Sequence, residues 1–139
     1  MAGEAVYVDT SAFLAVMDTA DRQHRDATAA WEWLVEAGRS LVCSNYALTE
    51  TCALLQRRLG LEALRLFCAE VYPLLDVVWV TKTVHEAGME AVMVAGRRQL
   101  SLVDCVSFIV MRQVGIQRAF AFDAHFAEQG FRCLPGPRP

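Results

Sequence analysis

The sequence predicts an α/β domain in which a central parallel sheet of about five strands carries helices on both faces. Two observations lead to this prediction. Short apolar runs of the kind found in buried strands alternate along the chain with longer segments that have the spacing of amphipathic helices. The length of 139 residues is also that of one ordinary domain. We therefore expect a single domain over residues 1–134, followed by a flexible C-terminal tail over 135–139.

Elements in the first half of the chain are bounded by clear helix signals. The first strand runs directly into Asp9, and a helical pattern begins immediately afterwards. Gly38 ends the second helix, Ser44 caps the third, and Pro73 closes the fourth. The predicted elements are a strand at 6–8, a helix to about 18, a helix from about 21 to 37, a strand at 40–43, and helices at 44–59 and 61–72.

The second half continues the alternation of strands and helices. The apolar run Val77 to Val80 is typical of a strand buried on both faces of a parallel sheet. Ser101 caps a long helix that carries Asp104 and Ser107, and Asp123 lies between the last two strands. The predicted elements are a strand at 77–80, helices at 82–95 and 101–115, and strands at 119–122 and 131–134.

Composition excludes several classes of protein. The formal net charge is −3, so the chain lacks the global positive field of many nucleic-acid-binding proteins. A phosphate-bearing partner would have to be held by local positive groups or by a metal ion. The five cysteines are an odd number without any C-x-x-C spacing, which favours reduced thiols over disulfides or a zinc site. The sequence lacks an apolar run of the roughly 18 residues that span a membrane and a signal peptide's basic start, so we expect a cytoplasmic protein without membrane contact.

Four acidic residues are the candidate functional groups: Asp9, Glu50, Asp104 and Asp123. Each also has a purely structural interpretation. Asp9 and Asp123 are placed to cap helices, and Ser101 with Asp104 fits the capping box. Glu50 lies early in its helix, where the helix dipole favours an acid. Taken one at a time, none of these residues requires a functional role.

Taken together, the four acids point to a metal site. The carboxyl ends of parallel strands meet at one edge of a sheet, so Asp9 and Asp123 are expected at the same rim, with Glu50 and Asp104 on helices that start there. Carboxylates forced together repel one another unless a cation neutralises them. An all-oxygen set of this kind suits Mg²⁺ or Mn²⁺.

The ordered set of motifs resembles the PIN-domain ribonucleases, and specifically the VapC-type toxins of toxin–antitoxin pairs. The resemblance covers nearly the whole chain. Relatives often have Thr or Ser at the position of Ala121, where this chain departs from the pattern. The matching stretches are Val8-Asp9-Thr10-Ser11, Leu48-Thr49-Glu50, Leu100 to Phe108, and Ala121-Phe122-Asp123-Ala124-His125-Phe126.

The resemblance implies a PIN-like α/β/α sandwich and a metal-dependent endoribonuclease that hydrolyses RNA phosphodiester bonds. It also implies a small antitoxin as partner and a homodimer, for which the apolar faces over 61–71 and around Trp33 are suitable surfaces. Acidic residues form the metal site in that family, and the resemblance implies that Asp9, Glu50, Asp104 and Asp123 are the metal ligands of this chain. The resemblance also implies that the hydroxyls of Thr10, Ser11 and Ser107 orient the acids or a water.

Local positive charge for an RNA substrate is expected from two arginine pairs, Arg57 with Arg58 and Arg97 with Arg98. These arginines are equally well explained as solvated helix ends and loops. The isolated histidines His24, His85 and His125 are predicted to be structural or surface residues.

Two other functions remain open from the sequence. One is a catalytically silent PIN-like module that binds RNA or protein. The other is a haloacid-dehalogenase-like phosphatase, whose nucleophile also follows the first strand. That enzyme needs a second Asp two residues after the nucleophile, and the position is Ser11 in this chain.

Overall fold

The protein is built on a five-stranded parallel sheet, as seen in a computed structural model whose described residues are 3–136. The strand order is β3-β2-β1-β4-β5, which confirms the predicted fold class. Residues 137–139 of the predicted tail lie outside the described residues. The strands are β1 (Gly3–Val8), β2 (Arg39–Ser44), β3 (Leu75–Val78), β4 (Arg118–Phe120) and β5 (Arg132–Leu134). The α-helices are α1 (Thr10–Met17), α2 (His24–Glu36), α3 (Asn45–Leu59), α4 (Leu61–Leu66), α5 (Lys82–Ala95), α6 (Leu102–Val114) and α7 (His125–Glu128).

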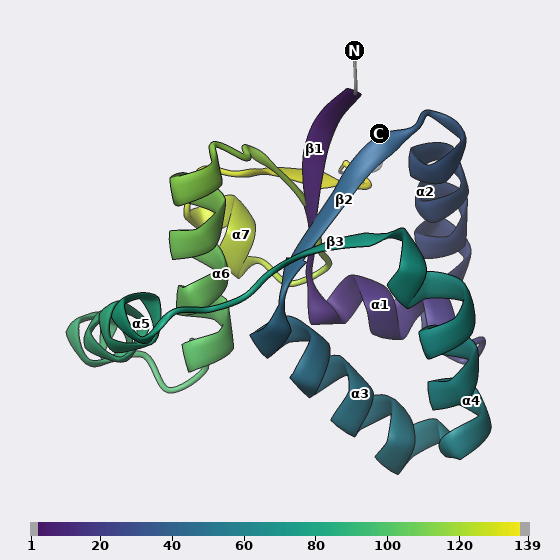
Figure 1. The fold of residues 1–139 in the computed structure, drawn as a ribbon, viewed down its shortest axis with the longest axis horizontal. Coiled ribbons are helices and arrows are strands. Elements are labelled where there is room, and N and C mark those ends of the chain that lie inside the picture. Colours follow the sequence, from purple (N-terminus) through teal and green to yellow (C-terminus); the bar gives the residue numbers. More distant parts are fainter. Residues whose placement is uncertain (1–2, 137–139) are drawn as a thin grey trace.

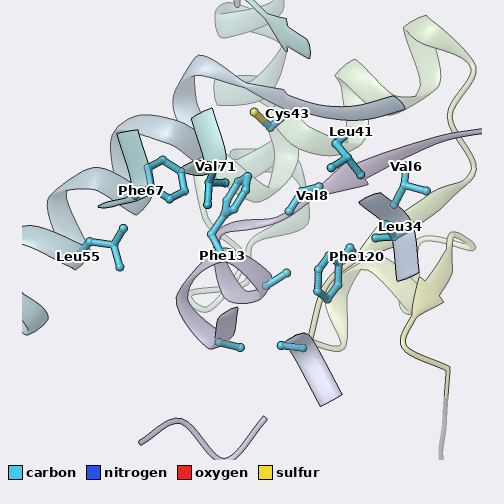
Figure 2. Packing of buried hydrophobic residues seen from close by; sticks show 13 residues of the cluster. Val6, Val8, Phe13, Leu34, Leu41, Cys43, Leu55, Phe67, Val71 and Phe120 are labelled. Atoms are coloured by element: carbon cyan, nitrogen blue, oxygen red, sulfur yellow. The ribbon is translucent and has the colours of Figure 1, made fainter. Parts of the chain in front are cut away.

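Helices cover the sheet on both faces (Figure 1). Helices α1, α2 and α4 lie on one side of the strands, and α5, α6 and α7 lie on the other. Two buried clusters fill the space between the layers. In the first cluster the rings of Phe13 and Phe67 meet edge to face with centroids 5.3 Å apart (Figure 2). Among the described residues, no helix combines the length and apolar character needed to cross a membrane.

Strand β1 lies at the centre of the sheet and supplies side chains to both layers. Successive residues of a strand point to opposite faces. Val6 and Val8 therefore enter the cluster beneath α1 and α2, whereas Tyr7 enters the cluster beneath α6. All three side chains are fully buried. Asp9 is the first residue after this buried strand, so its position is fixed by the core on both sides.

The third strand lies two residues earlier than the sequence predicted. Val77 and Val78 of β3 pair with Cys43 and Ser44 of β2. Strand β2 ends at Ser44 because α3 begins there, so the residues after Val78 have no strand partner. Trp79 is instead 67% exposed, and the prediction of a strand at 77–80 buried on both faces was wrong.

The helix predicted over 61–72 is not a continuous α-helix. Helix α4 ends at Leu66, and a π-helical turn (Phe67–Val71) and a 3-10 turn (Tyr72–Leu74) follow. Phe67 and Val71 are both buried in the cluster of Figure 2. The wider turn accompanies the burial of these two side chains, which the apolar spacing alone did not reveal.

Helices α5 and α6 approach each other closely at Gly88. A Cβ atom at position 88 would lie 2.6 Å from Val106 Cγ2 and 3.1 Å from Leu102 Cδ1. Such distances are well inside van der Waals contact, and Val106 is fully buried with a branched side chain that has few alternative rotamers. Glycine is thus required by packing, and it keeps α5 against the helix that carries Asp104.

We expect Gly88→Val to lower the free energy of unfolding by about 1–3 kcal/mol, the usual cost of overpacking a close contact. Ala87→Val is the matched control, because Ala87 is exposed on the same helix. Intrinsic helix propensity favours the first substitution and disfavours the second. Urea denaturation measures both, and a smaller loss for Gly88→Val than for Ala87→Val would contradict the packing argument.

Candidate active site

Asp9 lies at the junction between β1 and α1. Its backbone N–H donates to the carbonyl of Phe120 in β4 at 3.0 Å, which ties the junction to the neighbouring strand. Its carboxylate Oδ2 accepts from the backbone N–H of Ser11 at 3.1 Å and from the Ser11 hydroxyl at 2.6 Å. The side chain is only 3% exposed. Asp9 is therefore the N-cap of α1 as well as the predicted functional acid.

The Ser11 hydroxyl connects Asp9 with a second part of the chain. While it donates to Asp9, its oxygen accepts from the backbone N–H of Phe122 at 3.0 Å. Phe122 immediately precedes Asp123, so one hydroxyl holds the segments that carry two of the acids. Thr10 has a different role, because its hydroxyl donates to the carbonyl of Ala47 in α3 at 3.2 Å.

Asp123 lies in the loop between β4 and α7. Its Oδ1 accepts from the backbone N–H of His125 at 2.9 Å, as expected for an acid that caps the turn after it. Burial and the negative charge of Asp104 raise the pKa of the Asp123 carboxyl, although hydrogen bonding to His125 opposes the rise. The loop therefore fixes this carboxyl in a position where its charged form is disfavoured.

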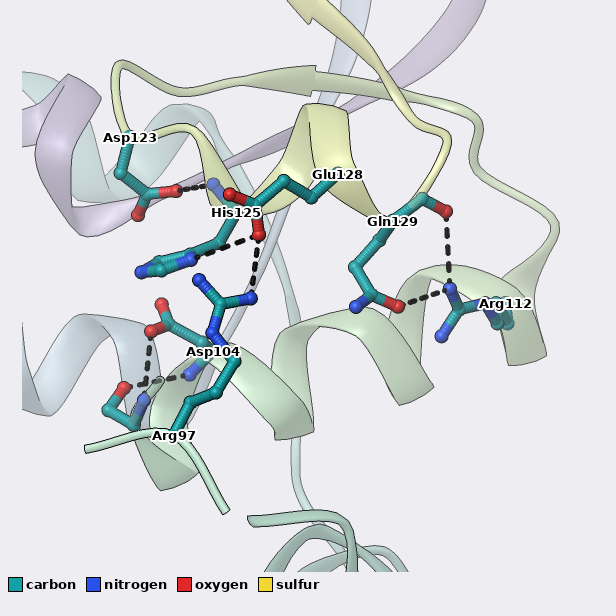
Figure 3. A network of polar contacts seen from close by, with 8 residues as sticks. Arg97, Asp104, Arg112, Asp123, His125, Glu128 and Gln129 are labelled. Carbon is teal, nitrogen blue, oxygen red and sulfur yellow. Dashed lines mark hydrogen bonds and ion pairs between the residues drawn. The ribbon is translucent and has the colours of Figure 1, made fainter. Parts of the chain in front are cut away.

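Asp104 lies in the first turn of α6 and completes a capping box. Its backbone N–H donates to Ser101 Oγ at 3.1 Å, and its Oδ2 accepts from the backbone N–H of Ser101 at 3.0 Å. The structural interpretation of this residue is therefore correct, but it does not exclude a second role. Figure 3 shows the Asp104 carboxylate on the side of α6 that faces the loop of Asp123.

Three carboxylates converge at the rim of the sheet. Asp9, Asp104 and Asp123 each offer an oxygen atom, and these oxygens all lie within 4.8 Å of one another. Burial, followed by the charges of Asp123 and Asp104, raises the pKa of Asp9 from 3.8 to about 7, against the lowering effect of the Ser11 hydrogen bonds. The donors are all oxygens that repel one another when ionised, so the group fits a hard divalent cation.

Glu50 lies apart from this group. It is half-buried in the second turn of α3, whose N-cap Ser44 ends the neighbouring strand β2 at the same rim. Within residues 3–136, it is not one of the carboxylates that approach within 4.8 Å of each other. Of the four predicted acids, the structure therefore brings three into mutual proximity, and Glu50 is not a member of this group.

Tyr7 is a buried partner of this site that sequence reasoning missed. Its hydroxyl lies 2.7 Å from Ser107 Oγ in α6 and donates to Ser44 Oγ at 3.3 Å. Ser107 therefore pairs with Tyr7, whereas the resemblance had implied that it orients an acid or a water. Tyr7 lies in β1 two residues before Asp9, and Ser107 lies one turn after Asp104 in α6. The alternation of the strand pattern was the available signal for Tyr7.

The predicted arginines differ in their distance from the acids. Arg97 forms an ion pair with Glu128 of α7, with Nη1 and Oε2 2.8 Å apart, and Glu128 Oε2 lies 3.7 Å from His125 Nδ1 (Figure 3). Figure 3 shows this group beside Asp104 and Asp123, so His125, which was predicted to be a structural or surface residue, lies close to the acids. Arg57 lies in the last turn of α3, about 18 Å along the helix from Asn45 at the rim.

The chain is similar to known proteins of one family. The family model described as the PIN domain matches residues 6–132. A curated relative from Mycobacterium tuberculosis, named 23S rRNA-specific endonuclease VapC20, is 35% identical over 127 residues, which cover 91% of this chain and 95% of the relative. The same name and identity are found in a second strain of that organism.

Solved structures agree with this result. The crystal structure of Mycobacterium tuberculosis VapC20, described as a sarcin-ricin loop cleaving toxin, superposes with a TM-score of 0.81 at 34% identity. It covers 91% of this chain and 96% of the solved chain. FitAcB from Neisseria gonorrhoeae has a TM-score of 0.67 at 11% identity, over 92% of this chain and 95% of the solved chain, and shows the fold alone.

The raised pKa of Asp9 predicts a pH-dependent stability in the presence of a chelator. The Asp9 carboxyl binds a proton more tightly in the folded protein than in the unfolded chain. The free energy of unfolding therefore rises as the pH falls below about 7, and the rise is complete below about pH 3.8. Between pH 8 and pH 5.5 we expect the free energy of unfolding to rise by about 2 kcal/mol from this group.

Urea denaturation at the two pH values, in chelator, measures this change. Asp9→Asn is the control variant, because an amide oxygen can still accept the capping hydrogen bond while the titrating group is gone. The variant should lose most of the difference between pH 8 and pH 5.5. An equal difference in both proteins would mean that the Asp9 carboxyl is not held as the structure indicates.

Proposed function

The chain belongs to the PIN-domain family, and on this premise we propose that it is a metal-dependent endoribonuclease, the toxin of a toxin–antitoxin pair. The observation that carries the proposal is the group formed by Asp9, Asp104 and Asp123. The name of the curated relative supports ribosomal RNA as the substrate class, and the description of the solved relative as a toxin supports the same role here. The substrate is accordingly a folded RNA in which one exposed phosphodiester bond reaches the rim of the sheet.

Asp9, Asp104 and Asp123 would hold a Mg²⁺ or Mn²⁺ ion through carboxylate oxygens. When bound, such an ion neutralises charge on the phosphodiester and lowers the pKa of a bound water, which supplies the nucleophile. Glu50 is assigned to the edge of the site, where its carboxylate would accept a proton from a water molecule or would help to hold the ion through a water. Its position in α3, outside the group of three carboxylates, supports this assignment over direct ligation.

The chain's own contribution is to keep the acids oriented before the substrate arrives. The Ser11 hydroxyl fixes the Asp9 carboxylate, the Ser101 backbone N–H fixes Asp104, and the His125 backbone N–H fixes Asp123. Each acid is therefore held by a local hydrogen bond from its own helix start or turn. This arrangement leaves little rotational freedom to be lost when the transition state forms.

A small antitoxin and a second copy of the chain are the proposed partners. Exposed apolar side chains provide candidate surfaces for them, and Trp33 on α2 is 49% exposed while Leu66 on α4 is 54% exposed. Arg57, Arg58, Arg97 and Arg98 are proposed contacts to RNA. Of these, the position of Arg97 near the acids in Figure 3 gives it the strongest support.

The alternative functions are less well supported. A haloacid-dehalogenase-like phosphatase requires an acid at position 11, whereas Ser11 is occupied in holding Asp9 and the Phe122 N–H. A catalytically silent module has no need to hold three carboxylates together at a rim. That arrangement raises the pKa of Asp9 and Asp123 and so disfavours their charged forms.

Asp104→Asn should abolish RNA cleavage without unfolding the protein, because asparagine can keep the capping box while removing one metal ligand. The assay is cleavage of purified 23S rRNA with Mg²⁺ or Mn²⁺, and chelator should stop it. Glu32→Gln, at an exposed acid of α2, is the control and should keep full activity. Absence of any metal-dependent cleavage by the unsubstituted protein would favour the silent module.

Ser11→Ala should weaken Mn²⁺ binding and cleavage by about 10- to 100-fold, the usual effect of removing a hydrogen-bond partner of a metal ligand. Isothermal titration with Mn²⁺ reports binding separately from activity. Thr10→Val is the control for loss of a neighbouring buried hydroxyl that contacts α3 instead of an acid. Equal effects on Mn²⁺ affinity in both variants would show that Ser11 acts only through stability.

A further inference from the structure

We propose that Arg112, Arg118 and Arg132 form a second RNA-binding surface, which contacts phosphodiester groups of the substrate outside the catalytic rim. We call these three residues the arginine track. The proposal rests on the proposed function, since it concerns how the same RNA is held. It assigns a role to arginines that lie on α6 and at the starts of β4 and β5, away from the carboxylates.

Arg118 and Arg132 are neighbours on adjacent strands. They are register partners in the parallel pair β4 and β5, so their backbones lie about 4.8 Å apart. Both line an open cavity of about 420 Å³ beside the end of α6. Both also line a second open cavity of about 410 Å³ with residues of β5. The two arginines therefore border two hollows, one beside the starts of β4 and β5 and one along β5.

Arg112 extends this surface along α6. Its guanidinium lies over the ring of Phe131, 5.1 Å from the ring centre, and its Nη2 donates to Gln129 Oε1 at 2.9 Å (Figure 3). Both partners are neutral, so the positive charge is held in place without being neutralised. Phe131 immediately precedes Arg132, and successive strand residues point to opposite faces. Arg112 therefore lies on the α6 face of the outer strand β5, whereas Arg118 and Arg132 point to its other face, and the track runs around the edge of the sheet.

The local balance of charge is positive. Glu4 is the acid that lines the first cavity, and its Oε2 lies 3.0 Å from Arg118 Nε. The Glu4 side chain is 68% exposed and the Arg118 side chain 28% exposed. A partly exposed ion pair of this kind contributes little stability, so an anion can replace Glu4. The end of α6 adds about half a negative charge. The three positive guanidinium groups outweigh the negative charges of Glu4 and of the end of α6, although the whole chain has a formal net charge of −3.

The distance from the acids suits a continuous RNA strand. Arg112 follows Asp104 by eight residues of α6, or about 12 Å along the helix. Arg118 pairs with Val6, three residues before Asp9 on β1, or about 10 Å along the sheet. At roughly 3.4 Å per stacked nucleotide, these separations correspond to about three nucleotides. Strand β5 is the outer strand of the sheet, so RNA can pass along this side of the protein.

Charge complementarity favours RNA phosphates as the occupant. Arginine binds phosphate oxygens through paired N–H groups. Among the residues that line the first cavity, Arg118, Arg132 and the amide of Gln117 offer side-chain N–H donors to an anion. The catalytic rim itself carries three carboxylates and repels phosphates until a cation is bound. A separate positive surface supplies the attraction that this rim lacks.

The test is the binding of a fluorescein-labelled RNA hairpin to the protein in the presence of a chelator. Without a cation the three carboxylates repel RNA, so the affinity that remains is attributed to the arginine track. Fluorescence anisotropy over a series of salt concentrations gives the dissociation constant and its salt dependence. In the double variant Arg118→Gln/Arg132→Gln, we expect weaker binding and a slope of log affinity against log salt reduced by about 2.

Two control pairs separate the track from net charge and from misfolding. Arg22→Gln/Arg25→Gln removes the same charge at exposed positions before and within α2, and should leave the slope unchanged. Arg118→Lys/Arg132→Lys keeps the charge and should keep the slope. If the salt dependence of RNA affinity is the same in Arg118→Gln/Arg132→Gln as in Arg22→Gln/Arg25→Gln, the proposal is overturned.

A parallel titration with phosphatidylserine vesicles addresses the other polyanion that arginines attract. Binding to vesicles that depends on the track, without a change in RNA affinity, also overturns the proposal. Failure of the proposed function would appear differently, as an absence of metal-dependent cleavage of 23S rRNA by the unsubstituted protein. The binding experiment in chelator does not depend on cleavage, so the two failures are distinguishable.

Discussion

The constraint on which the structure depends is the placement of three carboxylates within 4.8 Å of one another at the end of a buried strand. Burial and mutual repulsion raise the pKa of Asp9 to about 7 and also raise that of Asp123. An unconstrained chain would separate these groups to lower their energy. The fold must therefore hold them with interactions formed elsewhere, and the parallel sheet with its two buried clusters provides that support.

Two hydroxyl groups, those of Ser11 and Tyr7, connect the elements that carry the acids. Ser11 joins the start of α1 to the segment before Asp123, and Tyr7 joins β1 to α6 through Ser107. Gly88 then allows α5 to pack directly against α6. Each acid is thus positioned by the element that carries it and by a second contact to a neighbouring element, so small shifts of one helix are resisted by the others.

Sequence patterns predicted the elements well where the pattern was local. The strand before Asp9, the cap at Ser44 and the capping box at Ser101 follow from adjacent residues and appear as expected. The position of β3 could not be predicted in this way, because the pairing of Val78 with Ser44 and the start of α3 decide where that strand ends. An apolar run that includes Trp79 cannot reveal where its partner strand stops.

The sequence by itself determined the fold class and the resemblance to a family, and it predicted four candidate acids, because these depend on periodicity and on motif order. Only the tertiary structure decided that Asp9, Asp104 and Asp123 approach one another while Glu50 is not a member of this group. It also decided that Ser107 pairs with Tyr7 and that Arg118 lies beside Arg132. These relations join residues far apart in the chain, and distances between separate elements are set by packing, which a linear pattern does not encode.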